Sequence, residues 1–134
     1  QMNRIVALKT LRPAWGGRAD LVEALRAGYS ETLAFQHETI ARGYDVGSDP
    51  EQAPFFVVEE FTRGIDLRER IRRGAPFQLN AAVEIAIAVG EALEYAHERG
   101  VPHGDLIPAH ILVGPEGQVK VGGFGVAAAQ RRVG

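Results

Sequence analysis

Three histidines and one acidic residue lie close together in the second half of the chain: His97, His103, Asp105 and His110. Imidazole and carboxylate groups are ligands for zinc and can act as general acids or bases in hydrolysis. His97 ends an expected helix and His110 enters an expected strand, so this spacing does not make the side chains converge. The sequence therefore predicts no metal site, and metal-independent chemistry at Asp105 and the histidines is one hypothesis.

Composition predicts a globular chain without a membrane span. Of the 134 residues, 46% are hydrophobic and 24% are charged, which is enough apolar material for a modest core. The most apolar stretch, Ala81 to Ala92, is interrupted by Glu84 and Glu91, so no membrane-spanning helix is expected. The N-terminus lacks the long apolar core of a signal peptide, and a cytoplasmic location is the default expectation.

Charge and cysteine content exclude further classes of protein. The chain has no cysteine, which rules out disulfides and thiolate metal sites. A net charge of -2 gives no electrostatic footprint for nucleic acid. One local group of arginines is interpreted as a solvated helix face rather than a docking patch: Arg63, Arg68, Arg70, Arg72 and Arg73.

The first half of the chain predicts three strands and one helix. An alternating apolar run from Arg4 to Leu11 is typical of a strand. Asp20 followed by Glu23 forms a capping-box pattern at the start of a helix. Strands are then expected at Ile40 to Val46 and at Phe55 to Phe61, and these two are expected to pair across a turn-rich loop.

The second half predicts two helices and a hairpin. A short helix is expected after Gly64, and a long amphipathic helix with Asn80 as its N-cap reaches His97. Residues 111–121 read as two short strands joined by a tight loop. The tail at residues 127–134 is small-residued and basic, and we expect a frayed end or a linker there.

Two segments carry a family resemblance. His103 to Leu112 reads H-G-D-L-I-P-A-H-I-L, and Gly122 to Gly125 reads G-G-F-G. They resemble the catalytic loop H-R-D-L-K-P-x-N-I-L and the metal-binding D-F-G loop of protein kinases of the bacterial serine/threonine type. Val6 to Lys9 resembles the family's V-A-I-K strand, and His37 to Ile40 resembles its H-P-N-I segment.

The resemblance implies a fold and its organisation. The expected class is α+β, a truncated protein kinase-like fold. It has a small antiparallel sheet with one helix, then a long helix and a β-hairpin from the start of the family's C-lobe. Residues 1–134 are expected as a single domain, in which residues 1–61 correspond to the N-lobe, residues 65–127 to the start of the C-lobe and residues 128–134 to a tail. The glycine-rich loop has no expected counterpart before Arg4.

In the catalytic loop the resemblance assigns roles residue by residue. Asp105 matches the family's catalytic base and His103 matches its structural histidine, and both are expected to be vestigial. Gly104 stands where the family has an arginine. Ile107 replaces the lysine that steadies the transferred phosphoryl group.

Three further positions depart from the family's pattern. His110 aligns with the asparagine that binds the second magnesium ion, and Gly123 stands where the metal-binding aspartate is expected. Magnesium prefers oxygen ligands, which neither residue supplies from its side chain. Gly28 falls on or near the place of the helix-borne glutamate that pairs with the phosphate-binding lysine.

The nucleotide-binding residues, if nucleotide binding is retained, are Lys9, Glu59, Glu60, Phe61 and Thr62. Lys9 matches the lysine that binds the α- and β-phosphates of ATP, and the other four match the strand and hinge that frame adenine. Glu59 stands at the usually apolar gatekeeper position, and two orientations are open. Pointing inward, it would pair with Lys9 in place of phosphate; a strand shifted by one residue would turn it to solvent.

These departures lead to a functional hypothesis. The chain is predicted to be a catalytically inactive pseudokinase, not an enzyme, that serves as a protein-protein interaction or assembly module in a bacterial signalling or regulatory protein. A non-hydrolysing ATP or ADP sensor is the alternative. No cofactor is expected beyond weak ATP or ADP binding without magnesium. Self-association or a protein partner is expected at an uncovered apolar surface around Phe124, Leu93 and Val89.

Overall fold

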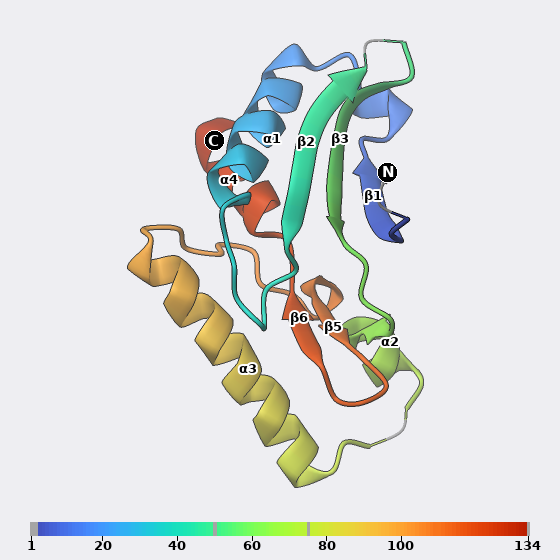
Figure 1. Ribbon diagram of the computed structural model, residues 1–134, viewed down its shortest axis with the longest axis vertical. Coiled ribbons are helices and arrows are strands. Elements are labelled where there is room, and N and C mark those ends of the chain that lie inside the picture. The colour runs from blue at the N-terminus through green and yellow to red at the C-terminus, as the bar shows by residue number, and fades with distance from the viewer. Residues whose placement is uncertain (1–2, 50, 75, 134) are drawn as a thin grey trace. The chain divides into compact units, whose positions relative to one another are not determined.

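The computed structural model describes residues 3–49, 51–74 and 76–133, and these form two compact units. The first unit combines the N-terminal segment up to Phe35, the segment Arg42–Phe61 and the chain from Phe124 onward. The second unit combines Gln36–Ala41 and Thr62–Gly123. The chain therefore passes into the second unit twice and returns to the first unit at its C-terminal end (Figure 1).

A three-stranded antiparallel sheet forms the first unit's centre. Its strands lie in the order β1 (Val6–Thr10), β3 (Ala53–Glu60) and β2 (Gly43–Asp49). The central strand β3 carries a dense run of aromatic and β-branched residues, which suits a strand paired on both edges. Alternate β3 residues, Phe55, Val57 and Glu59, are buried. The predicted pairing of the second and third strands is confirmed.

Helix α1 (Ala19–Thr32) follows the short 3-10 turn η1 (Pro13–Trp15) and packs against β2 and β3. Ala24, Leu25 and Tyr29 recur at helical spacing and are buried. The ring of Tyr29 lies 5.6 Å from the ring of Phe55, in a tilted arrangement that favours aromatic pairs. These contacts form the core of the first unit.

The last helix, α4 (Phe124–Val133), lies beside α1 in the first unit (Figure 1). The two helices meet at a pair of glycines, Gly28 on α1 and Gly125 on α4. A Cβ atom added at Gly28 would overlap the Gly125 carbonyl oxygen and lie 2.7 Å from the Ala129 nitrogen. A Cβ atom added at Gly125 would lie 2.6 Å from the ring of Tyr29. The absence of side chains at both positions therefore permits this close backbone approach.

The helical tail differs from the sequence-based expectation of a frayed end or linker. Ala127, Ala128 and Ala129 are buried, because their small side chains let α4 pack closely. Arg132 Nη2 lies 3.2 Å from Glu31 Oε2 and connects the last turns of α4 to α1. The described part of the first unit thus has two α-helices, where one was expected.

The second unit contains a sheet of three short strands in the order β4 (Ile65–Asp66), β5 (Ile111–Val113) and β6 (Val119–Val121). The hairpin expected at β5 and β6 is confirmed. Helices α2 (Leu67–Arg72) and α3 (Leu79–Glu98) and the short turn η2 (Pro108–His110) complete this unit. Helix α3 packs against β6.

Residues Gln36–Ala41 belong to the second unit because backbone bonds join them to β6. Ile40 forms a parallel bridge with Val121. The Val121 amide donates to the Thr39 carbonyl at 2.8 Å. The Gln36 amide donates to the Tyr95 hydroxyl of α3 at 2.9 Å.

Both expected N-caps were wrong. The N-cap of α1 is Arg18, and Asp20 lies in the first turn, where it accepts two hydrogen bonds from the Arg18 guanidinium at 2.9 and 2.6 Å. These bonds lower the pKa of Asp20 to about 2. The N-cap of α3 is Gln78 rather than Asn80, because the helix begins at Leu79 and the Ala82 amide already donates to the Gln78 carbonyl. Among the described residues, no helix is both long and apolar enough to cross a membrane.

Replacing Gly28 with alanine tests the close approach of α1 and α4. Alanine normally stabilises a helix interior by about 0.5–1 kcal/mol relative to glycine. At Gly28 the added methyl group overlaps the backbone of α4. We therefore expect a net loss of about 1–3 kcal/mol in the free energy of unfolding, measured by urea titration.

Gly90→Ala is the matched control for this measurement. Gly90 lies inside α3, and an added Cβ atom there meets nothing within 4 Å. We expect this variant to gain about 0.5–1 kcal/mol. A Gly28→Ala variant that gains stability to the same extent would contradict the glycine crossing.

Candidate functional site

An ion pair between Lys9 and Glu59 lies on the buried face of the first unit's sheet. β1 and β3 are antiparallel, with Ala7 opposite Glu59 and Lys9 opposite Val57. Lys9 and Glu59 are therefore diagonal neighbours on one face, within reach of long side chains. Lys9 Nζ lies 2.7 Å from Glu59 Oε2.

Burial differs between the two partners. Glu59 is only 6% exposed, whereas the Lys9 side chain is 53% exposed. Of the two orientations left open by the sequence, the structure has Glu59 pointing inward, because β3 alternates in register with Phe55 and Val57. An unpaired carboxylate at such a position is strongly unfavourable, and the Lys9 ammonium group compensates its charge.

The neighbouring hydroxyl of Tyr29 stays protonated beside this pair. Burial is the main cause that raises the pKa of Tyr29, and the negative charge of Glu59 raises it further. Both effects disfavour a tyrosinate. Tyr29 is therefore a neutral hydrogen-bonding group and not a base at physiological pH.

The predicted hinge residues continue from the end of β3. The Glu60 amide donates to the Arg42 carbonyl at 2.7 Å, and the Arg42 amide donates to Glu60 Oε2 at 3.2 Å. Phe61 is 48% exposed. The hydroxyl oxygen of Thr62 is buried, and it has no hydrogen-bond partner within the described parts of the chain. Assignment of these residues to nucleotide binding stays a prediction.

In the second unit, His103 organises the loop that follows α3. The residue is 2% exposed. The Asp105 amide donates to its Nδ1 at 3.2 Å, and its Nε2 lies 2.8 Å from the Gly122 carbonyl oxygen. An amide can only donate and a carbonyl can only accept, so the ring carries its proton on Nε2. His103 thereby connects the loop to the residues that follow β6.

His110 and Gly123 occupy adjoining space in this unit. His110 Nδ1 lies 2.8 Å from the Asp105 carbonyl oxygen, and the His103 and His110 rings are 5.6 Å apart. Gly123 has a φ of +85°, and a Cβ atom added there would lie 2.9 Å from His110 Nδ1. A side chain at position 123 therefore requires movement of the ring at position 110. The two positions matched to magnesium ligands are coupled by packing.

The other predicted site residues of the second unit differ in their exposure to solvent. Ile107 is 43% exposed, and Asp105 is half-buried. His97 is exposed in the last turn of α3. Within residues 3–49, 51–74 and 76–133, no group of three or more metal-binding side chains is arranged to hold an ion.

The predicted partner surface needs one correction. Phe124 is 3% exposed, and its ring makes an edge contact with the ring of Phe35 at 5.9 Å, so it belongs to the first unit's interior. Val89 and Leu93 are half-buried on α3. Large exposed apolar side chains lie elsewhere on this helix: Leu79, Val83 and Ile87.

Sequence reasoning missed these three α3 residues and also Trp15. The signal for the α3 residues was present, because they recur every four positions and so share one helix face. No motif marks Trp15 in the sequence, although it is the chain's one tryptophan and is 49% exposed.

Comparison with known proteins identifies the class to which this fold and these loops belong. The family model described as "Protein kinase domain" matches residues 1–133, so the chain belongs to that family. The serine/threonine-protein kinase PknA of Mycobacterium tuberculosis is 32% identical over 132 residues, which are 96% of this chain and 31% of that protein. A "probable serine/threonine-protein kinase" of Streptomyces coelicolor is 32% identical over 131 residues, covering 96% of this chain and 20% of the relative.

Solved structures agree with the family. The crystal structure of the PknI kinase domain of M. tuberculosis superposes with a TM-score of 0.79 at 25% identity, covering 94% of this chain and 50% of that one. The predicted α+β protein kinase-like fold is confirmed. The chain spans about half of that kinase domain and between a fifth and a third of the two relatives' length.

The relatives correct one prediction. The chain was expected not to be an enzyme, because several positions depart from the family's motifs. Relatives at 32% identity are named serine/threonine-protein kinases, and this places the chain in an enzyme family. Departures from a motif at single positions do not outweigh that membership.

Replacing Lys9 with methionine tests the ion pair in the first unit. The variant leaves the Glu59 carboxylate buried without its partner. We expect a loss of about 1–3 kcal/mol in the free energy of unfolding at neutral pH, measured by urea titration. The loss is smaller than the 3–5 kcal/mol typical of a fully buried pair, because Lys9 is half exposed.

A double-mutant cycle with Glu59→Gln provides the control. Glutamine keeps the size of the side chain and removes its charge. We expect Lys9→Met to be much less harmful in the Glu59→Gln background, with a coupling energy of about 1 kcal/mol. Additive effects of the two substitutions would contradict a stabilising pair.

Proposed function

We propose that this chain serves as a protein-protein interaction module of a bacterial signalling protein in the protein kinase family, and that it docks through α3. The observation that carries the proposal is the exposed apolar face of α3. Leu79, Val83 and Ile87 are 81%, 47% and 54% exposed. Ala86 and Gly90 lie on the same face and are also exposed.

Helix α3 is apolar nearly all round in its first three turns. Its opposite side carries Ala92 and Ala96, which are fully buried in the second unit. A helix with apolar residues on every side is typically buried on every side. An exposed apolar stripe of this size is typical of an interaction surface. The small residues Ala86 and Gly90 allow the backbone of a partner helix to approach closely.

Charge indicates the chemistry of the partner. Helix α3 carries four glutamates and no lysine or arginine. Three of them, Glu84, Glu91 and Glu98, are seven residues apart and form an exposed row along one side of the apolar face. Two copies of α3 would bring like charges together. The best match is a helix with an apolar stripe and a flanking row of lysine or arginine.

The double variant Val83→Glu/Ile87→Glu tests this surface. The probe is a synthetic amphipathic helix of leucine and lysine, compared with a leucine and glutamate helix of the same pattern. We expect the lysine helix to bind and the double variant to bind it at least about tenfold more weakly, which is about 1.4 kcal/mol. Calorimetry measures both affinities.

Leu8→Glu is the matched control, because Leu8 is a 62% exposed apolar residue on β1 in the first unit. It should leave binding unchanged. Equal loss in both variants, or tighter binding of the glutamate helix, would contradict docking at α3. Light scattering on the unmodified chain detects self-association. Self-association would mean that the partner at α3 is a second copy of the chain and not a basic helix.

A second candidate function is nucleotide sensing. One feature favours it: Lys9 matches, by sequence, the family's phosphate-binding lysine. Phosphate groups of ATP or ADP would compete with Glu59 for Lys9. The Glu59 carboxylate thus competes with the nucleotide phosphates for Lys9.

Thermal unfolding with millimolar ATP or ADP, with and without magnesium, tests this second function. Ligand that binds the folded state raises the Tm. We expect a larger rise for Glu59→Gln than for the unmodified chain, because the substitution releases Lys9, and no rise for Lys9→Met. An equal rise in all three proteins would contradict binding at Lys9.

A further inference from the structure

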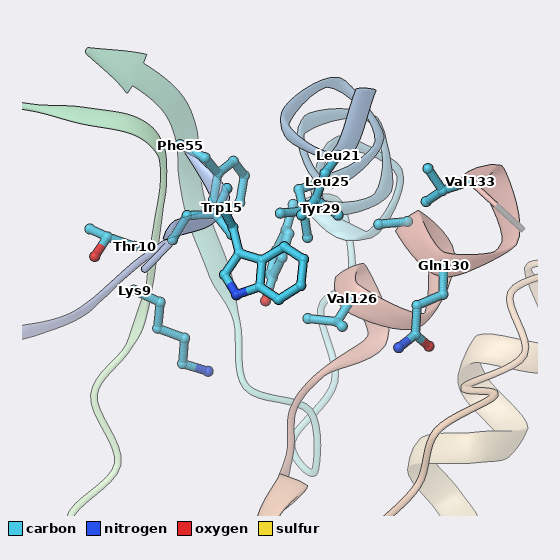
Figure 2. Close-up of a pocket in the computed structure, with 12 residues that line it drawn as sticks. Lys9, Thr10, Trp15, Leu21, Leu25, Tyr29, Phe55, Val126, Gln130 and Val133 are labelled. Carbon is cyan, nitrogen blue, oxygen red and sulfur yellow. The ribbon is translucent and has the colours of Figure 1, made fainter. Parts of the chain in front are cut away.

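The first unit contains an apolar pocket of about 530 Å³. It opens between β1, α1 and α4, as Figure 2 shows. Leu21, Leu25 and Tyr29 line it from α1, and Val126, Ala129 and Val133 line it from α4. All the lining residues belong to the first unit.

We propose that this pocket binds a small, uncharged molecule that contains a flat apolar ring. Its volume falls within the range of about 300–1,000 Å³ that is usual for small-molecule sites. The walls are mostly aliphatic and aromatic side chains, with a few polar groups at the side. This pattern suits a ligand that is held by apolar contact and oriented by one or two hydrogen bonds.

The charges of the lining side chains indicate the class of ligand. Lys9 is the one cationic side chain among the lining residues, and its ammonium group is engaged by Glu59 at 2.7 Å. Tyr29 is held in its neutral form by burial. The pocket therefore presents no free charge that a ligand must neutralise. The hydroxyls of Thr10 and Tyr29 and the Gln130 amide remain as neutral hydrogen-bonding groups.

Trp15 indicates the shape of the ligand. Figure 2 shows its indole ring standing beside the pocket, between Phe55 and Val126. Trp15 is 49% exposed although it lines an apolar pocket. The turn η1 begins with Pro13, whose ring fixes the backbone angle, and a Cβ atom added at Gly16 would lie 2.9 Å from Pro54. The indole is thus presented by a constrained turn, and a flat ring stacked on it would remove both from water.

The pocket is not a gap left by loose packing. Several of its walls are buried core residues, including Leu25, Tyr29, Phe55 and Ala129. The glycine crossing of α1 and α4 supports the wall that α4 contributes. These buried side chains form an apolar floor, and a ring compound bound on it would be removed from water.

The uncharged dye N-phenyl-1-naphthylamine is a suitable probe. Trp15 is the chain's one tryptophan, so a change in its fluorescence reports binding beside it. We expect saturable binding at one site per chain, with energy transfer from Trp15 to the dye. The anionic dye 1-anilinonaphthalene-8-sulfonate should bind at least about tenfold more weakly, which is about 1.4 kcal/mol.

Two substitutions that fill the pocket from opposite walls test the location, Val126→Phe from α4 and Leu21→Phe from α1. Each should abolish or strongly weaken dye binding, and urea titration identifies a variant that fails to fold. The Val83→Glu/Ile87→Glu variant is the matched control, because it removes the other apolar surface and should leave binding at Trp15 unchanged. Binding that survives both folded pocket variants would overturn the proposal. Tighter binding of the anionic dye, lost in Lys9→Met, would overturn the uncharged class of ligand.

Discussion

The close approach of α1 and α4 at Gly28 and Gly125 is the constraint on which the first unit depends. A side chain at either position would push the helices apart, because the atoms it would meet belong to backbone or to the buried ring of Tyr29. Because glycine has no side chain at either position, three consecutive alanines of α4 lie in the core. The same approach supports one wall of the apolar pocket, so the glycine pair determines both packing and cavity shape.

The central strand of this unit buries a charge instead of an apolar residue at its end. Phe55 and Val57 fill the core, and Glu59 continues their alternation inward. The structure accommodates the carboxylate because Lys9 lies diagonally opposite on β1. Lys9, which is predicted to match the family's phosphate-binding lysine, therefore has a structural partner. Its charge compensates Glu59 and makes the adjoining pocket electrically neutral, which connects the ion pair to the kind of ligand we propose there.

In the second unit, the two loops that resemble family motifs depend on one another through hydrogen bonds and packing. His103 keeps the loop in place through the Asp105 amide and the Gly122 carbonyl. The ring of His110 occupies the space that a side chain at Gly123 would need. Positions 110 and 123 are therefore coupled by packing. The family is nevertheless clear from the whole chain, because the order of strands, helices and loops is that of a protein kinase domain.

The sequence by itself determined most of the strands, the two helices between Ala19 and Glu98 that are longer than one or two turns, and the family. Alternation predicted the strands, and the ordered motifs from Lys9 to Phe124 predicted the kinase-like fold. Local patterns did not predict the helix starts correctly. At Asp20, for example, the Arg18 guanidinium binds the carboxylate that was expected to cap the helix. Only the tertiary structure decided that Glu59 points inward, that the tail is a packed helix, and that Trp15 lines a pocket. Each of these depends on contacts with atoms distant in sequence: the register of β3 against β1, the crossing of α4 with α1, and the helices that surround Trp15. Residue periodicity alone does not specify such contacts.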